Sequence, residues 1–173
     1  MAASSDAAIT VFAWGNESRG DDAIGAILAR RIIDLDNPAI NVVEDHQLNI
    51  EHIMDIVEKV PTLFIDASVA IETDYLLERL APFRDASIST HSISPVALLD
   101  LYEQTIGKEA PDAYLLHVRG NSFKLGDDIS PSTGISVNKA WQFLRDLFAR
   151  PCESWSPSLR AASSDRISWV TPS

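Results

Sequence analysis

The strongest constraint on the fold of this chain is the alternation of short apolar runs with segments of helical periodicity in its first half. Residues 9–14, 40–44 and 62–65 have the length and the β-branched or aromatic content of buried strands. Between these runs, residues 23–35 and 50–60 carry apolar side chains at helical spacing. Strands and helices that alternate in this way form a parallel sheet with right-handed crossovers. This half of the chain therefore predicts a β-α-β-α-β unit.

The second half of the chain predicts two more strands and two more helices. Residues 75–83 favour an edge strand, because Pro82 would break the hydrogen-bond ladder of a central strand. A helix is expected over residues 95–106, where a serine and a proline provide a cap and a first turn. Residues 113–118 then predict the last central strand, and residues 132–150 a long final helix.

The chain, at 173 residues, has the size of one domain. We expect residues 1–150 to form a single α/β domain, with a twisted and mostly parallel sheet of about five strands between helices. Periodicity disappears after Pro151, and the segment that follows is rich in serine and proline. Residues 151–173 therefore predict a disordered C-terminal tail.

The charge balance of the chain excludes a nucleic-acid partner. Lysine and arginine number 14 against 25 aspartates and glutamates, which gives a formal net charge of −11 and repels a phosphate backbone. The single cysteine, Cys152, excludes an intramolecular disulfide and fits a reducing compartment. No apolar run approaches the roughly 20 residues of a membrane span, and no signal peptide is visible. We therefore expect a cytoplasmic protein that does not bind membranes.

The junction between the first strand and the first helix holds an acidic, glycine-bearing loop. Its sequence is Gly15-Asn16-Glu17-Ser18-Arg19-Gly20-Asp21-Asp22-Ala23-Ile24-Gly25. Glycines allow a sharp turn, and Asp21 or Asp22 can cap the helix. A cap needs one carboxylate, whereas Glu17, Asp21 and Asp22 together stand against a single Arg19. This excess of negative charge indicates a site as well as a turn.

A candidate site follows from the topology of an open parallel sheet, where ligands bind beyond the carboxyl ends of the strands. Asp22 follows the first strand and Asp66 the third, so both are expected at the same rim, and His91 lies in a loop that can reach it. Two carboxylates and an imidazole suit a first-row divalent metal. Each residue also has a structural interpretation: Asp66 can cap a turn through Ser68, and His91 can be an ordinary loop histidine.

The remaining histidines are weaker candidates. His46 follows the second strand and can approach the rim, His52 is expected on a polar helical face, and His117 lies within a strand, in the core or on the sheet surface. Cys152 has no paired histidine or asparagine pattern and is not expected to be a nucleophile. A nucleotide-binding loop is disfavoured because the glycine loop lacks Gly-Lys-Ser/Thr and is acidic.

Four motifs in this order resemble the hydrogenase maturation endopeptidases over residues 9–150. They are Gly15-Asn16-x-x-Arg19-Gly20-Asp21-Asp22-x-x-Gly25, Ile65-Asp66-Ala67, Thr90-His91 with Ser94-Pro95, and Gly126-Asp127-Asp128-Ile129-Ser130-Pro131. The resemblance implies a phosphorylase/hydrolase-like sheet of about five strands, in agreement with the pattern above. The chain departs from many members at Ala23, where they have glycine. Residues 44–51 are similar to the branch that serves soluble, NAD-coupled hydrogenases.

The resemblance also implies an activity and a partner. Asp22, Asp66 and His91 match the three positions that the family uses to bind nickel, and Asp21 matches a neighbouring position that varies more. Such an endopeptidase removes a C-terminal extension from the nickel-loaded precursor of a nickel–iron hydrogenase large subunit. The nickel would come with the precursor, and we expect a monomer. A metal-polarised carbonyl, a metal-bound water and a carboxylate acting as general base are all compatible with these residues.

A phosphoacceptor receiver domain is the alternative from a different functional class. Receivers also place acidic residues after strand one and an aspartate after strand three, where they bind magnesium, and Asp22 and Asp66 lie 66 − 22 = 44 positions apart. They need a lysine after strand five, whereas Lys124 lies well beyond Val118. A receiver also has no use for the long glycine loop or for His91.

Overall fold

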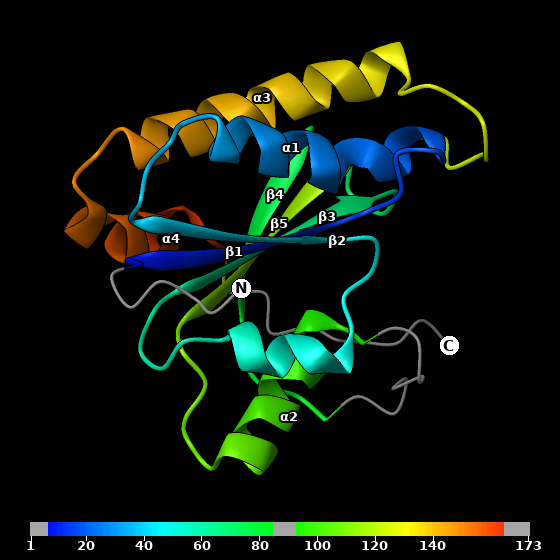
Figure 1. Cartoon of the computed structure of the whole chain (residues 1–173). Helices are drawn as coiled ribbons and strands as arrows, with labels where there is room; N and C mark the ends of the chain where they lie inside the picture. Colours follow the sequence, from blue (N-terminus) through cyan, green and yellow to red (C-terminus); the bar gives the residue numbers. More distant parts are fainter. Residues whose placement is uncertain (1–6, 85–92, 165–173) are drawn as a thin grey trace.

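Five strands form one twisted sheet in the order β2-β1-β3-β5-β4, in a computed structural model that describes residues 7–84 and 93–164 (Figure 1). The strands are β1 (Ile9–Trp14), β2 (Ile40–Asp45), β3 (Thr62–Ser68), β4 (Tyr75–Leu80) and β5 (Ala113–Arg119). The first four strands in the spatial order are parallel, and β4 pairs antiparallel with β5 at the edge. The expected mostly parallel α/β sheet is confirmed, and β4 is an edge strand as predicted.

Helices cover both faces of the sheet (Figure 1). One face carries α1 (Ile24–Ile33) and α3 (Pro131–Phe148), and the other carries α2 (Pro95–Ile106) and the 3-10 helix η2 (Ile50–Asp55). Each layer has its own core of buried side chains: Leu28, Leu116 and Leu144 belong to the first, and Phe12, Phe64 and Leu98 to the second. Among the helices of the described part of the chain, none is long and apolar enough to cross a membrane.

Two glycines make the tight connection from β1 to α1 possible. A Cβ on Gly25 would lie 2.0 Å from the carbonyl oxygen of Trp14, so only glycine lets the helix pack this closely on the strand. Gly15 has a φ of +152°, and a Cβ there would lie 1.9 Å from the carbonyl oxygen of Asp22. The short 3-10 helix η1 (Gly20–Ala23) fills the interval and leads directly into α1. The glycine loop is therefore a tightly packed turn whose backbone conformation sets the positions of its acidic residues.

The segment after α3 is folded, which corrects the prediction of a disordered tail for residues 152–164. The 3-10 helix η3 (Cys152–Ser154) is followed by the helix α4 (Trp155–Ala162), whose Trp155 is 1% exposed. The indole ring of Trp155 packs edge-on against Phe148, and its N–H donates to the carbonyl of Arg150 over 2.9 Å. With only eight residues, α4 is too short to show a clear period in the sequence. Residues 165–173 lie outside the described part.

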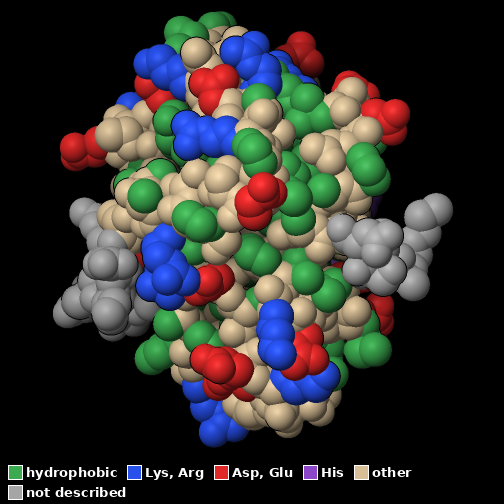
Figure 2. Space-filling view, turned by 90° about the vertical axis from the view of Figure 1, so that its left-hand side faces the viewer, with side chains coloured by type: hydrophobic (Ala, Val, Ile, Leu, Met, Phe, Trp, Pro, Cys, Tyr) green, Lys and Arg blue, Asp and Glu red, His purple; other side chains and the backbone are tan. Residues whose placement is uncertain are grey.

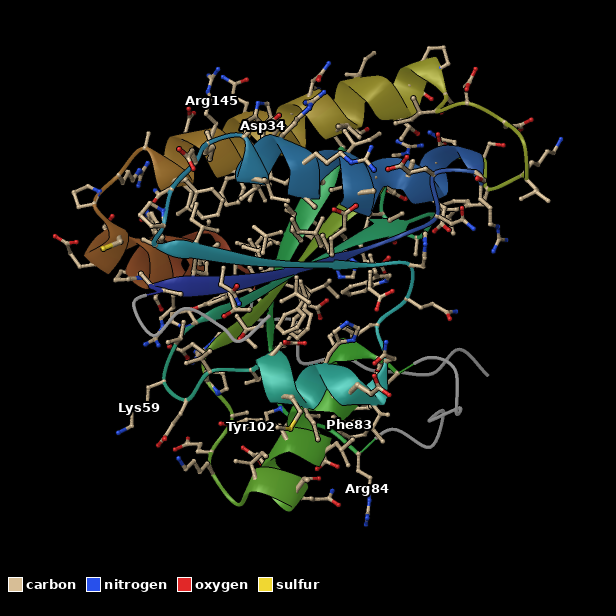
Figure 3. All side chains as sticks on the ribbon, viewed as in Figure 1. Asp34, Lys59, Phe83, Arg84, Tyr102 and Arg145 are labelled. Carbon is tan, nitrogen blue, oxygen red and sulfur yellow. The ribbon has the colours of Figure 1, made fainter. Side chains whose placement is uncertain are left out.

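The second predicted helix is shorter than the sequence pattern indicates. It was expected over residues 50–60, but η2 ends at Asp55, and Lys59 has a φ of 63°, which a helix cannot contain. Figure 3 places Lys59 in the connection from η2 to β3, and Tyr102 where α2 meets η2. The apolar positions that suggested a long helix are divided between η2 and this connection, and Ile56 packs in the core beneath α2.

The amino ends of the parallel strands lie on the side of the molecule that carries α4. Figure 2 shows this side, where acidic and basic side chains are interspersed and hydrophobic side chains lie between them. The negative net charge of the chain is therefore not concentrated on this face. The carboxyl ends of the strands, and the loop from β1 to α1, lie at the opposite end (Figure 1).

Candidate functional site

Asp22 and Asp66 lie together at the carboxyl end of the sheet, as the topology predicts. Asp22 is in η1 and is oriented by the backbone N–H of Asn16, which donates to its Oδ2 over 3.1 Å. Asp66 is in β3, next to β1, and is partly buried. The two carboxylates are close enough that the charge of Asp22 raises the pKa of Asp66. The structure therefore brings two of the three predicted site residues together.

The electrostatics of Asp66 are those of a carboxylate that a cation would stabilise. Burial raises its pKa to about 6, and repulsion by Asp22 acts in the same direction. The N–H of Ala67, the charge of His117 and a hydrogen bond with the Trp14 side chain oppose this rise without cancelling it. Two carboxylates that repel each other in a partly buried place fit the donor set of a divalent metal ion.

His91, the third predicted residue, lies outside the described part of the chain. Within residues 7–84 and 93–164, no group of three histidine, cysteine, aspartate or glutamate side chains converges on one point. Ile93, two positions after His91, borders a cavity of about 460 Å³ next to Asp22. The other residues around this cavity are Trp14, Asn16, Arg19, His46, Gln47 and Leu48. The chain thus returns to the rim directly after the segment that carries His91.

Asp21 has a different role from its neighbour, and its partners lie a hundred residues away. Its side chain is fully buried and accepts hydrogen bonds from the loop after β5 and from the start of α3. The donors are the backbone N–H groups of Asn121, Ser122 and Ser130, at 2.7–2.8 Å, and the hydroxyls of Ser130 and Thr133. Burial alone would raise the pKa of Asp21, but these hydrogen bonds outweigh it and lower the pKa to about 2. Asp21 is therefore a structural anchor turned away from Asp22.

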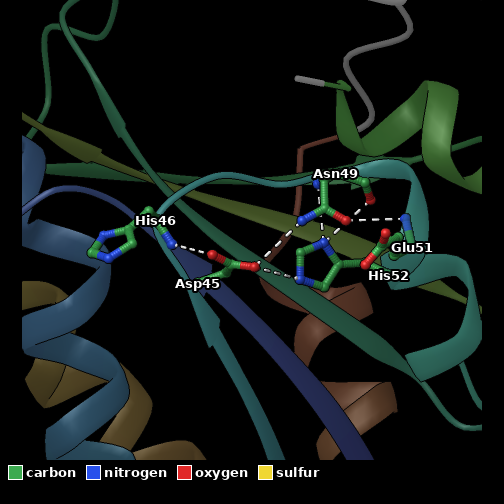
Figure 4. A network of polar contacts seen from close by, with 5 residues as sticks. All are labelled: Asp45, His46, Asn49, Glu51 and His52. Carbon is green, nitrogen blue, oxygen red and sulfur yellow. Dashed lines mark hydrogen bonds and ion pairs between the residues drawn. The ribbon is translucent and has the colours of Figure 1, made fainter. Parts of the chain in front are cut away.

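A second network holds the loop after β2, and it corrects the prediction for His52. Figure 4 shows Asp45 between His46 and His52, with Asn49 beside them. His52 was expected on a polar helical surface, but it is only 7% exposed. Its ring is turned inward, where Nδ1 accepts the N–H of Asn49 in a capping box. Its Nε2 lies 3.4 Å from Asp45, whose other oxygen accepts the N–H of His46 over 2.6 Å. His46 borders the cavity beside Asp22, so its expected approach to the rim is confirmed.

A row of polar side chains crosses the sheet on the face that α2 covers. It consists of Trp14, Asp66, His117 and Glu78, from β1, β3, β5 and β4, and we call it the polar row. Asp66 and His117 are partners in the strand register, and Nε2 of His117 lies 2.9 Å from Oε2 of Glu78. The sequence placed His117 in a strand but gave no sign of Glu78, because their proximity depends on the antiparallel pairing of β4 with β5.

The fold and the acidic rim define a class of α/β proteins with two carboxylates at the carboxyl end of a mostly parallel sheet, and solved structures share this fold. The chain is similar to a nickel–iron hydrogenase maturation protease HycI from Thermococcus kodakarensis KOD1, with 18% identity and a TM-score of 0.65. The match covers 90% of this chain and 96% of that chain. The hydrogenase maturating endopeptidase HybD from E. coli is similar at 17% identity and a TM-score of 0.60, over 79% of this chain and 88% of that chain.

A third structure, the maturation protease HybD from Thermococcus kodakarensis, matches at 18% identity with a TM-score of 0.57. It covers 80% of this chain and 97% of the HybD chain. Neither a protein-family model nor a curated sequence matches the chain. The chain therefore has the fold of the hydrogenase maturation proteases. The sequence identity is so low that this similarity establishes the fold and not the activity.

Proposed function

We propose that this protein is an endopeptidase that removes the C-terminal extension from the nickel-loaded precursor of a nickel–iron hydrogenase large subunit. The observation that carries the proposal is the pair Asp22 and Asp66, held at the carboxyl rim of a sheet with the maturation-protease fold. The likeness to solved maturation proteases spans most of both chains, which supports a shared mode of action. In this proposal the enzyme acts in the cytoplasm as a monomer.

In this proposal Asp22, Asp66 and His91 engage the nickel that the precursor presents. The nickel belongs to the substrate, so its contact with these residues reports that the metal has been inserted. The described residues fit such a partner, because repulsion by Asp22 raises the pKa of Asp66 and the charge of His117 does not cancel the rise. Oxygen and imidazole donors are also suitable ligands for a first-row divalent metal.

The cleavage itself adds water across one peptide bond. The water oxygen forms a bond to the carbonyl carbon, the C–N bond breaks, and the released amine receives a proton. A carboxylate oxygen of the Asp22 and Asp66 pair that does not contact the nickel can accept the proton of the water. Nickel held by Asp22, Asp66 and His91 would polarise the carbonyl or supply a metal-bound water. The backbone N–H of Asn16 orients the Asp22 carboxylate in the free protein.

The cavity beside Asp22 is the proposed site for the peptide next to the cleaved bond. Its wall combines hydrogen-bonding side chains, including Asn16, Arg19 and Gln47, with the apolar Leu48 and Ile93. A cavity of about 460 Å³ accommodates one or two side chains of a peptide. Its loop is held by the Asp45 and His52 network, so the wall is formed before the substrate arrives.

The receiver alternative is disfavoured by the strand arrangement. Receiver sheets are doubly wound and parallel throughout, whereas β4 here is antiparallel and lies at the edge. The strand β5 also ends with Arg119 where a receiver needs its lysine. If the protein were a receiver, acetyl phosphate would label Asp66, and absence of labelling is expected.

The experiment that tests the protease incubates a nickel-loaded large-subunit precursor with the protein and measures the precursor mass at the C-terminus. Loss of a defined C-terminal peptide is expected with the unmodified protein and not with Asp22→Ala. Glu17→Ala is the matched control, because Glu17 is an acid of the same loop whose partner is Arg30 on the surface. An unchanged mass for every nickel-loaded precursor tested with the unmodified protein would refute the proposed activity.

A further inference from the structure

Arg19 is the cation of the acidic loop, and its side chain is paired with none of the acids around it. Of the three acids in this loop, Glu17 pairs with Arg30. Asp21 is the buried anchor, and Asp22 accepts a backbone N–H. Within residues 7–84 and 93–164, the Arg19 guanidinium forms no ion pair and no hydrogen bond. In a chain with 25 acidic and 14 basic residues, an unpaired arginine beside carboxylates is available for an anion from outside.

The backbone of Arg19 is held in place, although its side chain has no partner there. The N–H of Arg19 donates to the carbonyl of Asn16 over 3.0 Å, and its carbonyl accepts the N–H of Asp22 over 3.2 Å. The N–H of the next residue, Gly20, donates to the carbonyl of Asp127 over 3.0 Å. The base of the Arg19 side chain is therefore fixed, and the ordering cost of binding falls on the side chain alone.

Arg19 borders the cavity of about 460 Å³ beside Asp22. Among the residues of its wall, Arg19 is the one arginine and Asp22 the one carboxylate. The other polar side chains are those of Asn16, His46 and Gln47, and each of them can donate a hydrogen bond. A guanidinium binds a carboxylate through two parallel N–H···O bonds, and further donors can satisfy the remaining lone pairs. The wall therefore has the donors that a carboxylate ligand needs.

We propose that Arg19 binds a carboxylate of the precursor in this cavity, beside the peptide bond that is cut, and so helps to select the substrate. The inference rests on the proposed function for the identity of the partner. Two parts of a precursor carry such a group: an aspartate or glutamate side chain near the cleaved bond, and the free C-terminus of a short extension. Asp22 repels either one, and nickel bound to Asp22 offsets this repulsion. The same cavity thus favours a nickel-loaded precursor over a nickel-free one.

The test measures the binding of three short peptides to the isolated protein by ¹H–¹⁵N NMR titration. Acetyl-Ala-Ala-Asp-amide has a side-chain carboxylate, acetyl-Ala-Ala-Ala has a terminal carboxylate, and acetyl-Ala-Ala-Asn-amide has neither. The Nε–H of Arg19 and the indole N–H of Trp14 report on the site, since both side chains border the cavity. A carboxylate peptide is expected to bind about 5- to 30-fold more tightly than the amide peptide. The tighter of the two carboxylate peptides identifies the source of the group.

Four variants separate direct contact from a general effect of charge. Arg19→Gln should weaken binding of the carboxylate peptide by about 5- to 30-fold, and Arg19→Lys should keep part of the affinity because it retains the charge without the planar fork. Asp22→Asn should strengthen the same binding by about 2- to 5-fold, because it removes a repulsion. Arg30→Gln is the matched control: it removes the same charge, but Arg30 is paired with Glu17 and does not border this cavity. Its dissociation constants should stay within about twofold of those of the unmodified protein.

Cleavage of a nickel-loaded precursor gives a second readout, and the outcomes distinguish this inference from the proposed protease. Arg19→Gln is expected to raise KM more than it lowers kcat, because the contact is made in the bound substrate as well as in the transition state. Carboxylate peptides that bind no more tightly than the amide peptide, or equal losses in Arg19→Gln and Arg30→Gln, would overturn the inference and leave the protease intact. Carboxylate binding that depends on Arg19, without cleavage of any nickel-loaded precursor, would overturn the protease and leave the carboxylate site in place.

Discussion

Replacing Asp21 by asparagine should lower the free energy of unfolding considerably, although it changes only one carboxylate oxygen to an NH₂ group. The Oδ2 atom of Asp21 accepts hydrogen bonds from Asn121 N–H, Ser122 N–H and two hydroxyls, and Oδ1 accepts from Ser130 N–H. An asparagine amide must turn its NH₂ group toward one of these two sets of donors. The better choice still leaves the buried N–H of Ser130 without an acceptor. The variant therefore loses a charge and at least one hydrogen bond.

The magnitude follows from the pKa of Asp21. Lowering that pKa from 3.8 to about 2 on folding contributes roughly 2.5 kcal/mol above pH 5. The hydrogen bond from the Ser130 N–H is one of the causes of the lowered pKa, so its cost of about 1 to 3 kcal/mol is part of this figure. We therefore expect Asp21→Asn to lower the free energy of unfolding by about 2.5 kcal/mol or more at pH 7. Because the folded pKa is depressed, the contribution of the charge is complete above pH 5 and is lost as pH falls through about 2.

The assay is urea denaturation followed by circular dichroism at pH 7, 5, 4 and 3. The difference between the unmodified protein and Asp21→Asn should be about 1 kcal/mol smaller at pH 3 than at pH 7, since part of the charge contribution has then been lost. Asp22→Asn is the control, because Asp22 accepts one backbone N–H at 3.1 Å and should change stability by less than about 1 kcal/mol. A loss below 1 kcal/mol in Asp21→Asn, or a difference that does not vary with pH, would refute the anchoring argument.

Three further predictions concern other positions. The raised pKa of Asp66 means that its contribution to stability is present below about pH 4 and is lost as pH rises through about 6. The free energy of unfolding of Asp66→Asn, compared with that of the unmodified protein in the same urea assay, should therefore be more favourable at pH 7.5 than at pH 4.5. Gly25→Ala should cost about 2 kcal/mol or more in thermal unfolding because of Trp14, whereas Gly134→Ala, within α3 and with open space around it, should gain about 0.5 to 1 kcal/mol. Trp155→Ala should cost about 3 to 5 kcal/mol by urea denaturation if α4 is part of the core, and a change below 1 kcal/mol would contradict that placement.

Much of the fold could be predicted from local sequence, because the signals that define it are short-range. The strands β1, β3 and β5 begin within a residue of the predicted positions, since each is a run of apolar residues in a buried parallel sheet. The serine and proline before α2 and the glycine after it also mark its ends correctly. The errors fall where the pattern is short or irregular: η2 is shorter than predicted, and α4 was missed.

In the candidate site too, some features could be predicted from the sequence and others could not. Topology alone predicts that Asp22 and Asp66 share a rim, because residues at the carboxyl ends of neighbouring parallel strands must be close. The opposite roles of Asp21 and Asp22 are invisible in the sequence, since they differ only in which way η1 turns each side chain. The partners of Asp21 come from residues 121–133, a hundred or more positions later.

The sequence by itself determined the α/β class, the strands of the sheet and the end of the sheet where the acidic residues gather, because periodicity and strand direction are properties of the local chain. The tertiary structure decided which carboxylate is buried as an anchor and which faces the rim, and it joined Glu78 to His117 beside Asp66. Those relationships depend on the pairing of β4 with β5 and on the docking of α3 against the glycine loop. Contacts between residues far apart in the chain set the solvation and charge of each carboxylate, and these in turn decide its chemistry.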